Sequence, residues 1–229
     1  MVKFKHIARS ANGRQTGPEP VNPGSNPGLA AMKNKSYSYQ DRKGLMPISW
    51  EKFHGLCKSL AIATSKFNPD IVLGIARGGL YPATLISHLL QKELYPIRLS
   101  RRVNDIVRYQ HPVWFVTIPG SIKGKRVLVV DEICDSGETL NLVKNEALKM
   151  GAIEVKSAVL YSHKKGKDIP DFIGLITNRL ILNPWDREIL KDGKYIFHPE
   201  YVDALKTQNI QPEESLLLGI KPESLAKEL

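Results

Sequence analysis

Cysteine, long apolar runs and acidic residues are all scarce in this sequence of 229 residues. The two cysteines, Cys57 and Cys134, cannot build a disulfide scaffold, so we expect a reducing compartment and a cytoplasmic protein. No run of about 18 uninterrupted apolar residues occurs, which excludes an ordinary membrane-spanning helix and predicts no membrane partner. Hydrophobic residues nevertheless make up 42% of the chain, as in typical globular proteins, which excludes wholesale disorder.

The shortage of acids leaves 33 Lys+Arg against 23 Asp+Glu, a formal net charge of +10. Such an excess favours an anionic partner (nucleic acid, a membrane surface or a phosphorylated small molecule), or it reflects only a basic surface. The longest basic runs, 123–126 and 164–167, are short, and each is broken by a glycine. We therefore expect no specific nucleic-acid partner.

Residues 1–31 differ in composition from the rest of the chain. Half of the positions from Gly13 to Gly28 are glycine or proline, and no apolar periodicity is present. Because such a stretch buries too little apolar surface to offset the entropy of ordering, we predict a disordered N-terminal extension over 1–31. It lacks the apolar core of a secretory signal, and Met32 is a second candidate for the start of translation.

Short apolar runs alternate with helical patterns through the middle of the chain. Strands are predicted at 70–76, 94–99, 113–118, 127–130 and 155–161, and helices at 50–67, 80–91 and 137–150. This alternation predicts an α/β fold, with a central, mostly parallel sheet and helices on both faces.

The pattern changes near residue 186, where short helical candidates follow one another. They span 185–191, 199–207, 212–218 and 222–229. We therefore predict three parts: the extension 1–31, a main domain 32–186 and a small C-terminal helical appendage 187–229.

The strongest chemical signal lies in residues 127–140, where an apolar strand is followed by Asp131, Glu132 and Asp135 and then a turn rich in hydroxyls. Ligands bind at the carboxyl ends of strands in open parallel sheets, and amides at a helix N-terminus bind phosphate. Adjacent carboxylates suit ribose hydroxyls or a hard divalent cation. The plainer interpretation, in which these acids are only solvated or cap the helix, explains less well why three of them share one short segment.

This segment resembles the phosphoribosyl-pyrophosphate signature of the type I phosphoribosyltransferases. Residues 74–80 (Gly-Ile-Ala-Arg-Gly-Gly-Leu) look like the pyrophosphate loop of that family, and Asn183-Pro184-Trp185-Asp186 is similar to the base-pocket segment of bacterial xanthine-guanine phosphoribosyltransferases. The resemblance covers 48–186 and implies the type I phosphoribosyltransferase fold. It implies purine salvage: transfer of the phosphoribosyl group from 5-phosphoribosyl-1-pyrophosphate to a purine base, giving a nucleoside monophosphate and pyrophosphate. A homodimer or homotetramer is also implied.

The resemblance assigns the sugar-phosphate donor to residues of the first two motifs. Arg77, Gly78 and Gly79 would hold the leaving pyrophosphate, and the family often has a cis peptide in this loop, here Ala76–Arg77. Asp131 and Glu132 would contact the ribose hydroxyls directly or through Mg²⁺, which makes them the expected metal ligands. The 5′-phosphate would lie against Ser136, Gly137, Glu138 and Thr139, with the Glu138 side chain pointing away.

For the purine base, the resemblance assigns the general acid/base at N7 to Asp135, the predicted catalytic residue. Lys164 stands where 6-oxopurine enzymes place a lysine on O6, and Ile181 and Asp186 are expected beside the base. Arg101, Arg102 and Arg108 lie in a stretch placed like the flexible lid of the family, although each also fits an ordinary solvated loop.

Two departures from the family pattern leave the base open. The position of the stacking aromatic is Leu180 here, and Trp185 is expected in the core or an interface rather than on the base. Asp135 favours hypoxanthine, guanine or xanthine, whereas the helical tail resembles archaeal purine phosphoribosyltransferases, some of which use adenine. The alternatives are therefore an adenine phosphoribosyltransferase on the same scaffold and, in another class, a nucleotide-sensing regulator that binds DNA or RNA.

Overall fold

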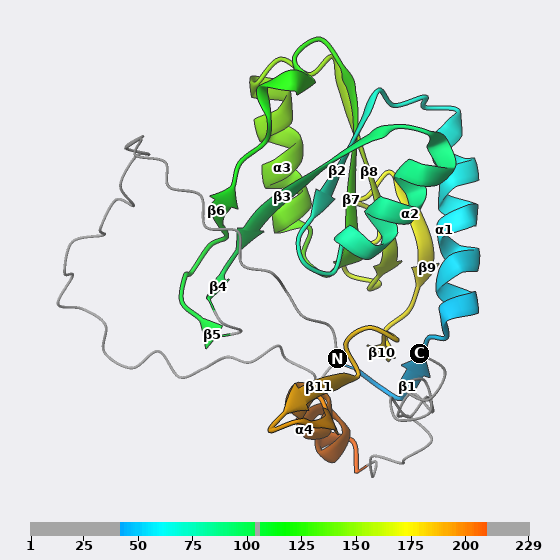
Figure 1. The fold of residues 1–229 in the computed structure, drawn as a ribbon, viewed down its shortest axis with the longest axis vertical. Coiled ribbons are helices and arrows are strands. Elements are labelled where there is room, and N and C mark those ends of the chain that lie inside the picture. Colours follow the sequence, from blue (N-terminus) through cyan, green and yellow to red (C-terminus); the bar gives the residue numbers. More distant parts are fainter. Residues whose placement is uncertain (1–41, 104–105, 210–229) are drawn as a thin grey trace, which may run out of the picture. The chain divides into compact units, whose positions relative to one another are not determined.

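The described part of the chain is built on a six-stranded sheet in the order β6-β3-β2-β7-β8-β9 (Figure 1). The structure is a computed structural model and describes residues 42–103 and 106–209. Every neighbouring strand pair is parallel except β3 and β6, so β6 is an antiparallel edge strand. The strands are β2 (Ile71–Ile75), β3 (Glu93–Ser100), β6 (Val113–Val116), β7 (Arg126–Cys134), β8 (Glu154–Ser162) and β9 (Phe172–Ile176). The mostly parallel sheet is as predicted, and β9 is an addition.

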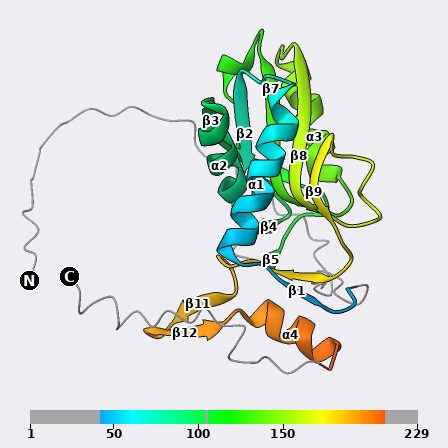
Figure 2. The same ribbon diagram turned by 90° about the vertical axis from the view of Figure 1, so that its right-hand side faces the viewer.

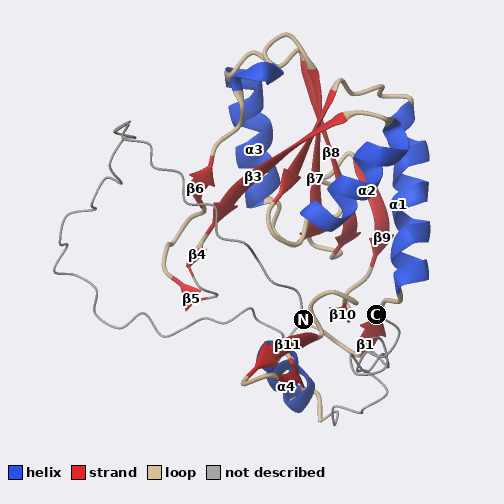
Figure 3. Cartoon of the chain, viewed as in Figure 1, coloured by secondary structure: helices blue, strands red, loops and turns tan. Residues whose placement is uncertain are grey.

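Helices cover both faces of this sheet (Figures 1 and 3). Helices α1 (Trp50–Ser65) and α2 (Leu80–Leu90) pack on one face, and α3 (Glu138–Lys149) packs on the other. Successive strand residues point to opposite faces, so β2 and β7 supply both cores. Val72 and Leu128 belong to the core under α1 and α2, and Leu73 and Val129 belong to the core under α3. This confirms the predicted layers.

Helix boundaries follow local chemistry. The Ser49 hydroxyl accepts a hydrogen bond from the Lys52 N–H at 3.1 Å and caps α1, as its sequence position predicts. Gly74 in β2 allows α2 to pack closely, because a Cβ there would lie 2.8 Å from the Ala83 Cβ. Within the described ranges, no helix is both long and apolar enough to cross a membrane.

The point where ligands bind in this kind of sheet lies between β2 and β7. From β2 the chain passes through α2 to β3 on one side, and from β7 it passes through α3 to β8 on the other side. The connections therefore diverge from two adjacent strands, which leaves a crevice at their carboxyl ends. The glycine loop follows β2, and the acids Asp131 and Glu132 lie in the carboxyl-terminal part of β7.

A smaller set of elements lies beyond the carboxyl edge of the sheet (Figure 2). Strand β1 (Leu45–Pro47) pairs in parallel with β10 (Leu180–Leu182), and β11 (Glu188–Lys191) forms an antiparallel hairpin with β12 (Lys194–Phe197). Helix α4 (Pro199–Thr207) follows and packs Ala204 and Leu205 against Leu180 and Leu182. The helix at 199–207 is confirmed, whereas β1 and β10 had not been predicted.

The helix expected at 185–191 is wrong, because residues 188–191 form strand β11. The reason is the turn that follows: Asp192 has φ 49° and Gly193 has φ 75°, both left-handed. Asp-Gly with two positive φ values is the preferred two-residue hairpin turn, and it folds β12 back onto β11. The appendage is thus a hairpin followed by a helix over its described residues. The extension 1–31, Met32 and the helices expected at 212–218 and 222–229 lie outside the described residues.

Candidate active site

The acids of the central strand lie inside β7 rather than beyond its end. Pairing with β2 stops at Gly74 opposite Val130, whereas pairing with β8 continues through Asp131 opposite Val159 to Cys134 opposite Ser162. The expected strand end at residue 130 was therefore too early. Because β7 outruns β2, Asp131 and Glu132 project past it on the side where the chain leaves β2.

The loop after β2 fills the space beside these acids. A Cβ on Gly79 would lie 2.8 Å from the Asp131 Cα and 2.6 Å from the Ile75 carbonyl oxygen, and one on Gly78 would collide with the Glu132 carboxylate. Only glycine therefore permits this approach. The Ala76–Arg77 peptide bond is cis, as the resemblance implied, and Arg77 is exposed at the tip of the loop. The two donor motifs thus meet in one crevice.

Burial dominates the electrostatics of the two acids. Both side chains are partly buried, and this burial raises the pKa of Asp131 to about 7. It raises the pKa of Glu132 to about 8, with further contributions from the negative charges of Asp186 and Asp131. Asn183 donates to Glu132 and in turn accepts from the Tyr161 hydroxyl at 3.0 Å. A bound cation, or hydroxyl donors of a ligand, would therefore stabilise the charged forms of these two carboxylates.

The donor set fits a shared magnesium ion. Asp131 and Glu132 offer the hard oxygens that Mg²⁺ prefers, and a cation would favour their charged forms. No group of three or more His, Cys, Asp or Glu residues within 42–103 and 106–209 is arranged to hold a metal. An ion here would take its remaining ligands from substrate oxygens and water, as Mg²⁺ commonly does.

The N-terminus of α3 forms the next part of the crevice. Gly137 precedes the helix with φ 75°, a conformation suited to glycine, and packs against Ile169. The Glu138 N–H donates to the Ser136 hydroxyl at 3.5 Å, while the Glu138 carboxylate contacts His111 Nδ1 at 2.8 Å. The carboxylate therefore has a partner outside the turn, as expected, and Ser136 is exposed at the helix start beside a half-buried Thr139. Free amides at such a terminus can bind phosphate.

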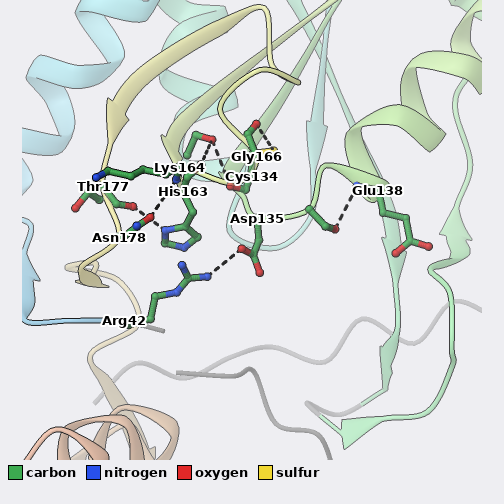
Figure 4. A network of polar contacts seen from close by, with 11 residues as sticks. Arg42, Cys134, Asp135, Glu138, His163, Lys164, Gly166, Thr177 and Asn178 are labelled. Carbon is green, nitrogen blue, oxygen red and sulfur yellow. Dashed lines mark hydrogen bonds and ion pairs between the residues drawn. The ribbon is translucent and has the colours of Figure 1, made fainter. Parts of the chain in front are cut away.

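Asp135 forms an ion pair that the sequence did not reveal. Arg42 Nη2 lies 3.0 Å from Asp135 Oδ1, with the arginine side chain 9% exposed and the aspartate side chain 40% exposed (Figure 4). His163 lies beside them, with Nδ1 2.7 Å from the Thr177 carbonyl oxygen. Burial lowers the pKa of His163, and the positive charge of Arg42 lowers it further. The predicted catalytic acid is therefore held by a buried cation.

A pocket of about 220 Å³ opens between these residues and the smaller set of elements. Predicted residues that line it are Glu132, Ile181, Asp186 and Arg102, and Leu180 stands there where the stacking aromatic was sought. The residues that sequence reasoning missed are Arg42, Ile133, His163, Arg179, Asn183, Glu200 and Tyr201. Asn183 lay within the recognised Asn-Pro-Trp-Asp segment, which is the signal that could have found it. Ile133 likewise lay within the recognised 127–140 segment, whereas the remaining five are isolated residues outside any motif.

Asp186 shows how α4 contributes to this pocket. Its Oδ2 accepts a hydrogen bond from the Tyr201 hydroxyl at 2.9 Å, whereas its Oδ1 is buried and has no hydrogen-bond partner among the described residues. Burial raises the pKa of Asp186 to about 6, and the Tyr201 hydrogen bond acts in the opposite direction. An acceptor oxygen is thus available to a ligand donor.

Other expected site residues lie farther out. Lys164 is exposed, and its backbone N–H donates to Asn178 Oδ1 at 3.0 Å. Arg101 is exposed too, and its carbonyl oxygen accepts from the N–H groups of Arg108 and Tyr109. The neighbouring strands β4 (Arg102–Val103) and β5 (Ile106–Val107) pair with each other, as part of the expected lid.

Two further contacts involve Arg102 and Trp185, residues singled out in the sequence. Arg102 Nη1 lies 2.8 Å from Glu200 Oε1, which joins β4 to α4. Trp185 stacks on Tyr81, with ring centroids 4.4 Å apart and planes at 13°. The expectation that Trp185 packs in the core or at an interface is consistent with this contact.

Sheet order, glycine loop, acidic strand and helix N-terminus together define a phosphoribosyltransferase fold. Residues 50–189 match the phosphoribosyl transferase domain family, and the chain belongs to this family of pentosyltransferases.

The relatives of this chain fall mainly in the purine branch. It is 32% identical over 149 residues to a xanthine-guanine phosphoribosyltransferase of Nitratidesulfovibrio vulgaris, covering 63% of this chain and 86% of that protein. It is also 32% identical over 109 residues to the transcriptional regulator GfcR of Thermoplasma acidophilum, covering 46% of this chain and 50% of the regulator. The crystal structure of a purine phosphoribosyltransferase from Pyrococcus horikoshii is 33% identical, with a TM-score of 0.55 and coverage of 62% of this chain and 93% of that one.

Proposed function

We propose that this protein transfers the phosphoribosyl group of 5-phosphoribosyl-1-pyrophosphate to a 6-oxopurine, releasing pyrophosphate and a nucleoside monophosphate. The observation that carries the proposal is the contact of Gly78 and Gly79 with the two acids of β7. That contact joins a candidate pyrophosphate loop to a candidate ribose site at one sheet edge. The named activities of the relatives from Nitratidesulfovibrio vulgaris and Pyrococcus horikoshii support the same reaction class.

In the proposed reaction the bond from ribose C1 to pyrophosphate breaks as a bond from C1 to a base nitrogen forms. Arg77 and the amides of the glycine loop would hold the leaving pyrophosphate, and the start of α3 would hold the 5′-phosphate. Asp131 and Glu132 would orient the ribose through its hydroxyls. Bound Mg²⁺ would neutralise charge on the leaving group.

Asp135 would receive the proton that the base loses. Its carboxylate is 40% exposed and stands next to the pocket residues His163 and Arg42, so a base in the pocket could reach it. General acid–base catalysis of this kind is worth about 10²–10⁴-fold in rate. The choice of a 6-oxopurine rests on this acid, because the resemblance associates it with hypoxanthine, guanine and xanthine enzymes.

The test is an assay of the purified chain with the pyrophosphorylated sugar, Mg²⁺ and each of hypoxanthine, guanine, xanthine and adenine. Pyrophosphate release that depends on a 6-oxopurine is expected. Asp135→Asn should lower kcat by about 10²-fold or more while leaving donor binding nearly unchanged. Asp192→Asn makes the same chemical change at an exposed hairpin turn and serves as the matched control. Turnover with adenine alone would favour the adenine enzyme instead.

The relative named as a transcriptional regulator supports a second candidate function. A nucleotide-sensing regulator would use the basic surface behind the net charge of +10 to bind DNA or RNA. Nucleic-acid binding that weakens steeply with salt, without base-dependent pyrophosphate release, would favour this function.

A further inference from the structure

The ion pair between Arg42 and Asp135 places a donor and an acceptor side by side at the pocket. The Arg42 side chain is nine-tenths buried, and one of its terminal nitrogens lies 3.0 Å from Asp135 Oδ1. Arg42 itself lines the pocket together with His163 and Ile181. A guanidinium has five N–H donors, and burial removes the water that would otherwise bind them. The donors that Asp135 does not use would therefore be stabilised by a hydrogen bond to an acceptor on a ligand.

This pairing is complementary to one edge of a 6-oxopurine. N7 and the oxygen on C6 are neighbours on that edge, and arginine is a frequent hydrogen-bond donor to this oxygen in guanine. A base that carries its proton on N7 presents N–H to Asp135 and O6 to Arg42. An amino group on C6 would instead point N–H donors at a guanidinium that has only donors, which leaves both groups unsatisfied.

We propose that Arg42 donates to the exocyclic oxygen on C6 of the base and thereby sets the preference for 6-oxopurines over 6-aminopurines. The inference rests on the proposed function, since it concerns the base site of that reaction. Arg42 enters from the segment before β1, far in sequence from every motif of the family, and it acts through direct contact with the base and by fixing the Asp135 carboxylate.

The structure favours Arg42 over the lysine that the resemblance suggested for this role. Lys164 is exposed, and its side chain runs toward Thr177, away from Asp135 (Figure 4). Among the described residues, Arg42 lines the pocket and Lys164 does not, and Asp135, which also stands behind the lining, is in direct contact with Arg42. The planar fork of arginine also matches a fixed acceptor better than a flexible ammonium does.

Base discrimination is the measurement that tests the inference. The ratio of kcat/KM for hypoxanthine to that for adenine is compared between the wild-type chain, Arg42→Met and Arg42→Lys. We expect Arg42→Met to lower this ratio by about tenfold or more, mainly by raising KM for hypoxanthine, since one hydrogen bond to a charged group is worth about 1.5–3 kcal/mol. Arg42→Lys keeps the charge, so its ratio should lie between those of the wild-type chain and Arg42→Met. Lys43→Met removes a neighbouring exposed cation and should leave the ratio unchanged.

Several outcomes would overturn the inference. An unchanged ratio in Arg42→Met, with a loss in Lys164→Met, would assign the oxygen to the lysine. An equal loss for both bases would mean that Arg42 acts only on folding or on the position of Asp135, and thermal melting of each variant would separate these two causes. Higher activity of Arg42→Met on every base would mean that the ion pair blocks the site.

The inference and the proposed function can fail separately. Absence of turnover by the wild-type chain with any purine would refute the proposed function. In that case, calorimetry of inosine monophosphate and adenosine monophosphate binding to the wild-type chain and Arg42→Met tests the role of Arg42 without turnover. Weaker binding of only the inosine nucleotide by Arg42→Met would support its role, and equal affinities in both proteins would refute it.

Discussion

The Tyr201 hydroxyl donates a hydrogen bond to Asp186 Oδ2 at 2.9 Å, and this contact joins α4 to the proposed base pocket. Asp186 follows β10, whereas Tyr201 lies in the first turns of α4, beyond the β11–β12 hairpin. The start of α4 is therefore part of the pocket wall. Substitutions in α4 can test this part of the pocket.

Tyr201→Phe removes this hydrogen bond while keeping the ring. We expect KM for the base to rise by roughly fivefold, because a hydrogen bond of this kind contributes about 1 kcal/mol. The pKa of Asp186 should also rise above its value of about 6, since the Tyr201 hydroxyl lowers it. Steady-state kinetics between pH 5 and pH 8 measure both effects. Tyr195→Phe, at an exposed site in β12, is the control and should change neither.

Gly79→Ala tests the close contact between the glycine loop and β7. The new Cβ would meet the Asp131 Cα and the Ile75 carbonyl oxygen, both backbone atoms that cannot move aside without shifting a strand. We expect at least about 1–3 kcal/mol of destabilisation, as for overpacking in a core, together with loss of donor binding. Thermal melting and titration with the sugar donor measure the two effects.

Gly55→Ala provides the matched control for that change. Gly55 is exposed in α1, and a Cβ there would have no neighbour within 4 Å. Because alanine is the better helix former by about 1 kcal/mol, this variant should be slightly more stable than the wild type and equally active. A similar loss in both variants would show that the loop contact is not the cause.

The raised pKa values of Asp131 and Glu132 predict that stability depends on pH. Folded pKa values of about 7 and about 8 exceed the ordinary values of 3.8 and 4.5, so the folded protein holds more protons than the unfolded chain between these limits. The stabilisation is complete below about pH 4 for these two groups and is lost as pH rises toward 8. Glu132→Gln should flatten the dependence of Tm on pH between 5 and 8.5.

Addition of Mg²⁺ with the sugar donor should reverse this trend. Cation binding favours the charged carboxylates, so the gain in Tm on addition should be larger at pH 8 than at pH 6. A gain that is the same at both pH values, or that survives in Glu132→Gln, would argue against Asp131 and Glu132 as the shared metal site.

The ion pair of Arg102 with Glu200 should contribute little to stability. The two side chains are 24% and 38% exposed, and such pairs contribute about 0–1 kcal/mol. Both residues make further interactions, so a double-mutant cycle with Arg102→Ala and Glu200→Ala is needed to isolate the pair. We expect a coupling energy below about 1 kcal/mol, and faster amide exchange in β4 and β5 in each single variant. A coupling of several kcal/mol would contradict this prediction.

The donor half of the site could be predicted from sequence because its residues are contiguous. The strand at 127–130, the acids after it and the helix at 137–150 all lie in one short segment, where hydrophobic periodicity and turn chemistry act locally. The glycine loop after β2 was equally local. What the sequence left out is that β7 extends past β2, which depends on the lengths of two paired strands.

The base half could not be predicted in the same way. β1 and β10 are three-residue strands, and Met46 pairs with Ile181 across most of the chain. They are stabilised by each other, by α4 and by the core under α1, contacts between segments that are distant in sequence. Arg42 is a single basic residue in no motif, and its role follows from burial beside Asp135. The hairpin at Asp192-Gly193, by contrast, carries a turn signal that could have been recognised.

The pairing of β1 with β10 bears on how a nascent chain acquires its activity on the ribosome. The backbone N–H of Gly44 donates to the Gln208 side chain at 2.7 Å, so the first described residues are tied to the last. All six strands of the sheet are present once β9 has emerged, whereas the pocket is complete only after α4 has emerged. A product terminated before α4 would retain the crevice between β2 and β7 but would lack Glu200 and Tyr201 in the pocket wall.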